Sequence, residues 1–212
     1  MREDAQRICE GAGAPLACTL VTISLFSTLA RHGVPIGLIG DIERETYRAQ
    51  LGALPEAQRL AAGLQFMSSE NQGSLRTQAA ESATTRQQAE HPQDFVYDFV
   101  EPGFGDTFGF GIDYKACGFC NFAAGHGDQG VLPNICGLDF VAYAARGIHL
   151  ERTQTLAAGA GHCDFRFSRL TPGEIELLSA PKRNSRSIGR VPSASCSPTC
   201  RSPPDPAARL KP

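Results

Sequence analysis

The sequence predicts an α+β protein in which N-terminal helices pack on a mainly antiparallel sheet, as a single domain with a disordered C-terminal tail. Segments rich in Ala, Gln, Glu and Arg fill the first half of the chain and favour helices. From residue 95 onward, aromatic residues recur at every second position, which is typical of half-buried strands. Helices that cover the aromatic side of such strands give a layered α+β fold.

Four helices are predicted in the first half, over residues 16–29, 41–52, 55–66 and 75–89. The first is apolar, but several Ser and Thr interrupt it and acidic residues precede it. It is therefore a poor signal peptide and too short for a membrane anchor. We expect a cytoplasmic protein with reduced thiols and no membrane partner.

The second half predicts a hairpin over residues 95–100 and 108–114, then a short helix after Cys117. The next helix spans 132–145, with Pro133 near its start and Gly147 just past its end. Strands at 149–155 and 162–167 complete a sheet of four or five strands. We divide the chain into a helical extension (1–30), an α+β domain (31–170) and a Pro-, Ser- and Arg-rich disordered tail (171–212).

Charge and length restrict the function. The 212 residues suffice to bury a core, and the net charge of −2 gives no general attraction for nucleic acid. We therefore expect a small-molecule substrate and no nucleic-acid partner.

Four cysteines are candidates for chemistry. Cys117 and Cys120 form a CxxC pair, which can hold half a zinc site, act as a redox dithiol, or simply pack. Cys136 and Cys163 follow on later elements, so all four thiols could meet on one tetrahedral zinc. The alternative is separate thiols in a core or pocket, and zinc is the one cofactor that the sequence suggests.

Charged residues accompany the thiols. Asp139 lies three residues after Cys136 and shares its helical face, either as a general acid/base or as a structural hydrogen-bonding acid. Asp164 and Arg166 alternate with the apolar residues of the last strand, and they either pair with each other or bind a substrate carboxylate. Arg152 is a second candidate anchor.

Four stretches carry a resemblance to a known family. They are GIDYKACGFC (111–120), LPNICGLDF (132–140), RTQTLAAG (152–159) and CDFRF (163–167). Their order and spacing resemble those of the L-2-amino-thiazoline-4-carboxylic acid hydrolase family, and the resemblance extends roughly over residues 31–169.

The resemblance implies hydrolytic opening of a cyclic amidine, on a route to cysteine. Such a reaction needs a nucleophile, a proton shuttle and a cation for the carboxylate. The residues expected to catalyse it are Cys117, Cys136, Asp139 and Cys163. Those expected to bind substrate are Arg152, Asp164 and Arg166. The residues that would bind zinc, if it is present, are Cys117, Cys120, Cys136 and Cys163.

Two positions depart from the resembled pattern. Ala116 and Ala158 stand where the family commonly carries acids. The segment from Cys117 to Phe167 also resembles, more loosely, vinyl-reductase-like ligand-binding domains. The alternative function is therefore a non-catalytic small-molecule sensor with a cysteine-rich site.

Overall fold

The computed structural model describes residues 15–82 and 95–179. The rest of the predicted extension and of the predicted tail, and the end of the helix expected at 75–89, lie outside the described residues. The described helices are α2 (Pro15–Arg31), α3 (Ile36–Gly52), α4 (Glu56–Phe66), α5 (Ser69–Ser82), α7 (Gly118–His126), α8 (Leu132–Ala144) and α9 (Pro172–Ser179). None of them is long and apolar enough to cross a membrane.

The strands form one antiparallel sheet in the order β1-β2-β4-β3. They span Val96–Val100 (β1), Phe110–Ala116 (β2), Ile148–Glu151 (β3) and Cys163–Arg169 (β4). Because β4 lies between β2 and β3, residues 110–116 and 163–169 become neighbours although they are far apart in sequence. The predicted α+β class and antiparallel sheet are confirmed.

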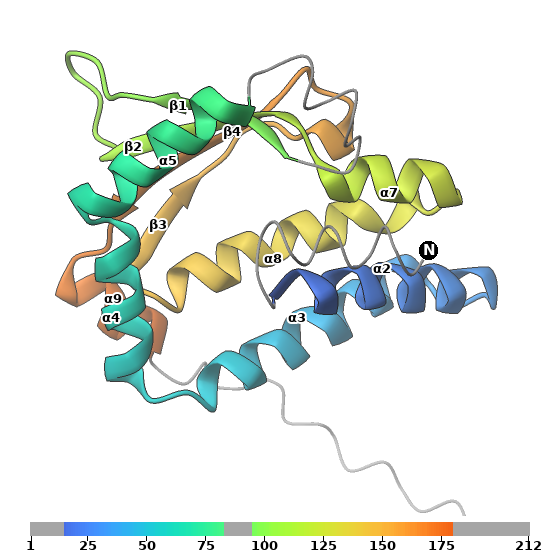
Figure 1. Cartoon of the computed structure of the whole chain (residues 1–212). Coiled ribbons are helices and arrows are strands. Elements are labelled where there is room, and N and C mark those ends of the chain that lie inside the picture. Colours follow the sequence, from blue (N-terminus) through green and yellow to red (C-terminus); the bar gives the residue numbers. More distant parts are fainter. Residues whose placement is uncertain (1–14, 83–94, 180–212) are drawn as a thin grey trace, which may run out of the picture. The chain divides into compact units, whose positions relative to one another are not determined.

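One face of the sheet is aromatic and the other is polar. The inward row pairs Phe99 with Ile112 and Ile112 with Phe165. Phe66 of α4 and Tyr143 of α8 pack against this face, and α5 runs beside β1 (Figure 1). The buried aromatic rows fix which residues face outward, because side chains alternate along a strand.

A second apolar cluster joins α2, α3, α7 and α8. Ile23 and Phe26 of α2, Ile39 of α3, Phe122 of α7 and Ile135 of α8 are buried together. Helix α8 therefore packs against helices on one side and β3 on the other (Figure 1). Its residues Cys136 and Asp139 both contact Arg152, the residue that follows β3.

Helix α5 begins at Ser69 instead of residue 75, and three further boundaries differ from the sequence prediction. Helix α3 begins at Ile36 instead of residue 41, directly after Pro35, whose ring fixes a backbone angle suited to a helix start. Strand β3 ends at Glu151, residues 152–155 of its predicted range have no regular secondary structure, and a 3₁₀ turn (Leu156–Ala158) follows them.

The last of these differences lies in the predicted tail, where residues 172–179 form α9. The backbone N–H of Thr171 donates to Glu174 at 2.8 Å, and the backbone N–H of Glu174 donates to the Thr171 hydroxyl at 3.3 Å. This reciprocal capping box, followed by Pro172 at the first helical position, stabilises a helix start. The proline-rich composition hid this local signal.

Candidate functional site

A surface cavity of about 370 Å³ lies at the edge of the sheet beside β3. It is lined by Phe140, Leu150, Glu151, Arg152, Thr153, Asp164 and Arg166. All three residues that the sequence predicts to bind substrate are among them. The lining combines two apolar side chains with two guanidinium groups and two carboxylates, a mixture that suits a small polar ligand.

Arg152 connects this cavity to the interior. Its guanidinium donates to the Asp139 carboxylate at 2.6 Å and to the Cys136 carbonyl at 2.8 Å. The rings of Phe140 and Phe165 lie on it, at 4.8 and 4.9 Å from the guanidinium carbon to the ring centroids. Only 5% of the Arg152 side chain is exposed. The position and orientation of this cation are therefore fixed by four contacts.

Asp139 is a carboxylate with an unusual pKa. Burial raises the pKa of Asp139 to about 6, although the Arg152 guanidinium opposes this. The side chain still keeps 38% of its surface exposed, so solvent reaches it and moderates the effect of the surrounding protein. A carboxyl group that titrates close to neutral pH is suited to proton transfer.

Two of the predicted catalytic thiols, Cys136 and Cys163, lie within electrostatic reach of Asp139. Burial is the main cause that raises the pKa of Cys136 to about 12. The charges of Asp139, Cys117 and Cys163 also raise this pKa, and the charge of Arg152 lowers it. Burial also raises the pKa of Cys163, whose sulfur accepts the backbone N–H of Leu156 at 3.2 Å. The structure therefore brings α7, α8 and β4 together at this point. These thiols are protonated near neutral pH.

Cys117 and Cys120 behave as a pair. The pKa of Cys117 is raised well above its usual value, first because its thiol hydrogen-bonds to Cys120 and then because it is buried. The same hydrogen bond lowers the pKa of Cys120. Both side chains are half-buried, and none of the four cysteines lines the described cavity.

Zinc binding by these thiols stays a prediction. The four sulfurs influence one another's pKa values. Within residues 15–82 and 95–179, however, no three His, Cys, Asp or Glu side chains are placed to hold a metal ion.

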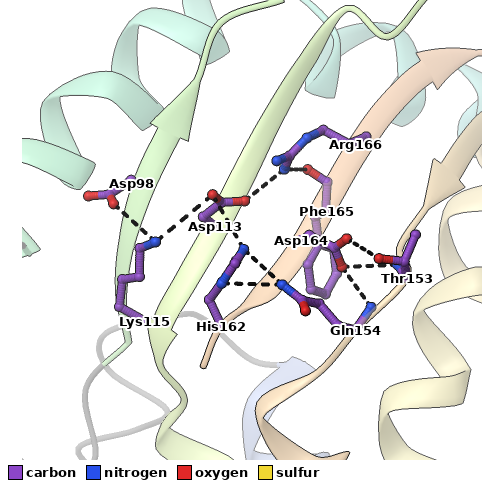
Figure 2. Close-up of polar contacts among 9 residues, drawn as sticks. All are labelled: Asp98, Asp113, Lys115, Thr153, Gln154, His162, Asp164, Phe165 and Arg166. Atoms are coloured by element: carbon purple, nitrogen blue, oxygen red, sulfur yellow. Dashed lines mark hydrogen bonds and ion pairs between the residues drawn. The ribbon is translucent and has the colours of Figure 1, made fainter. Parts of the chain in front are cut away.

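A polar network covers the outward face of the sheet next to the cavity (Figure 2). Asp113 of β2 lies at its centre and accepts a hydrogen bond from Arg166 at 2.8 Å. The Nε2 atom of His162 is 3.7 Å and the Nζ atom of Lys115 3.9 Å from the other Asp113 oxygen. Three basic side chains therefore surround one carboxylate whose own exposure is 17%.

Cross-strand register explains this network. Gly111 is the partner of Arg166 on the neighbouring strand, and a Cβ at Gly111 would come within 2.8 Å of the Arg166 side chain. Glycine at this position therefore leaves room for the Arg166 side chain to reach Asp113. Arg166 does not pair with Asp164, which was one of the two readings of the sequence.

The Asp164 carboxylate binds backbone N–H groups of the segment that follows β3. Its carboxylate accepts the backbone N–H groups of Thr153 at 2.9 Å and Gln154 at 2.8 Å (Figure 2). Burial raises the pKa of Asp164, but the hydrogen bonds from Thr153 and Gln154 outweigh it, so the net pKa is lowered. Asp164 thus holds the segment after β3 in place and keeps a negative charge on the cavity wall.

Sequence reasoning missed Asp113 and Lys115 as members of this face. A usable signal was present, because Asp113 alternates with Ile112 and Tyr114, just as Asp164 alternates with its apolar neighbours. What the sequence lacks is the register that puts Asp113 opposite Asp164. The departures at Ala116 and Ala158 fall at the end of β2 and in the exposed 3₁₀ turn.

Comparison with known proteins gives one match. The family model described as L-2-amino-thiazoline-4-carboxylic acid hydrolase matches residues 43–167. This segment includes the cavity lining, Asp139 and the four candidate cysteines. No curated protein and no solved structure matches the chain. The matched segment covers more than half of the sequence, and the chain belongs to this family, which is named for a hydrolase.

Proposed function

We propose that this protein is a hydrolase that opens a small cyclic amidine carboxylate, such as L-2-amino-thiazoline-4-carboxylate, to a carbamoyl-cysteine. The observation that carries the proposal is the contact between Asp139 and Arg152, which places a near-neutral proton acceptor beside a cation on the cavity wall. Family membership supplies the reaction class.

The raised thiol pKa values support water as the nucleophile. Because Cys136 and Cys163 stay protonated near neutral pH, neither is a ready thiolate nucleophile. Asp139 in its ionised form can instead take a proton from a water molecule. This reading gives the cysteines a role in shaping the surroundings of Asp139.

The proposed steps balance as follows. The water oxygen bonds to the ring carbon between sulfur and nitrogen, the electron pair of the carbon–nitrogen double bond moves to the ring nitrogen, and Asp139 takes one water proton and passes it to that nitrogen. Asp139 then takes the proton of the new hydroxyl group, which becomes the carbonyl, and passes it to the same nitrogen as the bond from the carbon to this nitrogen breaks and the nitrogen keeps the electron pair. The product carries a carbamoyl group on sulfur and a free amine.

The cations would hold the substrate carboxylate. Arg166 hydrogen-bonds to Asp113 and the Phe165 carbonyl through Nη1 alone, so other N–H groups of its planar fork can bind a ligand. Arg152 is fixed by Asp139 and Cys136, and it supplies positive potential close to the reacting carbon.

The test is direct. Purified protein is incubated with L-2-amino-thiazoline-4-carboxylate, and carbamoyl-cysteine is followed by mass spectrometry. We expect product with the wild type and at least a hundredfold less with Asp139→Asn, as is typical for the loss of a general base (roughly 10²–10⁴-fold). Product formation that is unaffected by Asp139→Asn would remove Asp139 from the mechanism, and no product at all would overturn the proposed reaction.

A second candidate function is ligand binding without turnover. It is favoured by Ala116 and Ala158, which stand where the resembled family carries acids. Binding of the thiazoline or of an aromatic ligand in calorimetry, with no product formed over hours, would select this function over the first.

A further inference from the structure

The proposed hydrolysis leaves the Cys117–Cys120 pair without a chemical role. Cys117 is the residue that caps the start of α7, and Cys120 is in its first turn, three residues later. Side chains at these two helix positions face each other, as the capping box shows for other residue types. The two thiols are free, and they lie within one helical turn of each other.

We propose that Cys117 and Cys120 form a thiol-modification site that closes to a reversible disulfide when the protein meets a low-molecular-weight disulfide. Both side chains are half-buried, so a small reagent can reach them. Cys120 is the first nucleophile in this proposal, since it lies in the first turn of α7, at the positive end of the helix. This site is independent of the proposed hydrolysis.

The exchange is a two-electron oxidation of the protein. The Cys120 sulfur attacks one sulfur of the reagent, forms a mixed disulfide and releases one thiolate. The Cys117 sulfur then attacks Cys120, closes the intramolecular disulfide and releases the second thiolate. The two protons of the protein thiols pass to the two released thiolates, and the reagent is reduced to two thiols.

The other two thiols are poorer partners. Cys163 is buried on β4, and its sulfur accepts the Leu156 N–H. Cys136 belongs to a different helix, so a bond to it needs two elements to hold the narrow distance that a disulfide requires. The Cys117–Cys120 ring, by contrast, closes within one turn of chain. Such a small loop removes little chain entropy, which makes the bond easy to reduce again.

The experiment uses the native full-length chain and oxidised glutathione. After exposure, free thiols are blocked with N-ethylmaleimide, and the protein is cut by trypsin and by a protease that cleaves before aspartate. Cleavage after Lys115 and before Asp128 isolates Cys117 and Cys120 in one peptide, residues 116–127, separate from Cys136. We expect this peptide to be unblocked, lighter by two hydrogens, and fully blocked after dithiothreitol treatment.

Rates and variants sharpen the test. The 116–127 disulfide is expected to form about tenfold faster than any modification of Cys163, which is buried. Cys136→Ser should leave its formation unchanged, and Cys120→Ser should abolish it and leave Cys117 available for blocking. The proposal is overturned if Cys117 or Cys120 links to another peptide, if glutathione stays attached to 116–127, or if both sulfurs remain fully blocked.

Discussion

The Asp139 carboxylate and the Arg152 guanidinium lie 2.6 Å apart, and their contact joins the middle of α8 to the residue that follows β3. The cavity wall and the thiol-rich interior meet at this ion pair. Because the two residues come from different elements, the pair both orients a cation for a ligand and fastens α8 to the edge of the sheet.

Asp139→Asn should destabilise the protein as well as impair activity. The change leaves Arg152, which is only 5% exposed, without its anionic partner. Breaking a fully buried pair costs about 3–5 kcal/mol, and the 38% exposure of Asp139 reduces our expectation to about 2 kcal/mol in the free energy of unfolding. Urea denaturation measures it. The matched control is Asp41→Asn, whose exposed pair with Arg44 should contribute less than about 0.5 kcal/mol; equal losses in the two variants would contradict the argument.

Arg166→Lys should affect substrate binding more than the chemical step. Lysine keeps the charge but loses the planar fork that reaches Asp113 and a ligand together. We expect KM for the thiazoline to rise about tenfold with kcat within about twofold, because the lost interaction acts equally before and during the reaction. Arg169→Lys on the same strand, which does not line this cavity, is the control. A fall in kcat with unchanged KM would assign Arg166 a different role.

Much of this fold can be read from local patterns. The alternation after residue 95 predicts the inward aromatic rows, and Pro133 and Gly147 mark α8 closely. Local patterns failed where composition misled, as at α9, whose Thr171–Glu174 capping box lies in a proline-rich segment.

The site was predictable in its members but not in its pairing. Arg152, Asp164 and Arg166 of the cavity lining were identified, because charged groups stand out in apolar strands, whereas Phe140 and Thr153 of the same lining were not. Their partners depend on the order β1-β2-β4-β3, which no local pattern encodes. Arg166 therefore pairs with Asp113 from a strand some fifty residues earlier, and Asp164 with the backbone of Thr153.

Glu43→Gln should stabilise the protein at alkaline pH. Glu43 is 6% exposed, neither carboxyl oxygen has a partner among the described residues, and burial raises its pKa to about 7. Since the folded-state pKa lies above the unfolded value of 4.5, the folded protein loses stability as the pH rises from about 4.5 through 7. The variant should therefore gain stability relative to wild type at pH 8, on the order of 2 kcal/mol, and little at pH 4. Thermal or urea unfolding at both pH values measures this.

The control is Glu45→Gln. Glu45 is exposed on the same helix, so this variant should show no such pH-dependent gain in stability.

Gly63→Ala should strongly destabilise the protein, because Gly63 of α4 packs against the turn that leads into β3. Gly63 is buried in α4, and a Cβ there would lie 1.8 Å from the Arg146 carbonyl oxygen, in the turn between α8 and β3. Backbone cannot move aside as a flexible side chain can, so α4 or the turn must shift, and we expect a loss of about 3 kcal/mol in the free energy of unfolding. Gly73→Ala in α5 is the matched control, since nothing lies within 4 Å of its added Cβ. There the helix propensity of alanine should stabilise the protein by about 0.5–1 kcal/mol. Two variants of equal stability in urea would show that α4 does not pack against this turn as described.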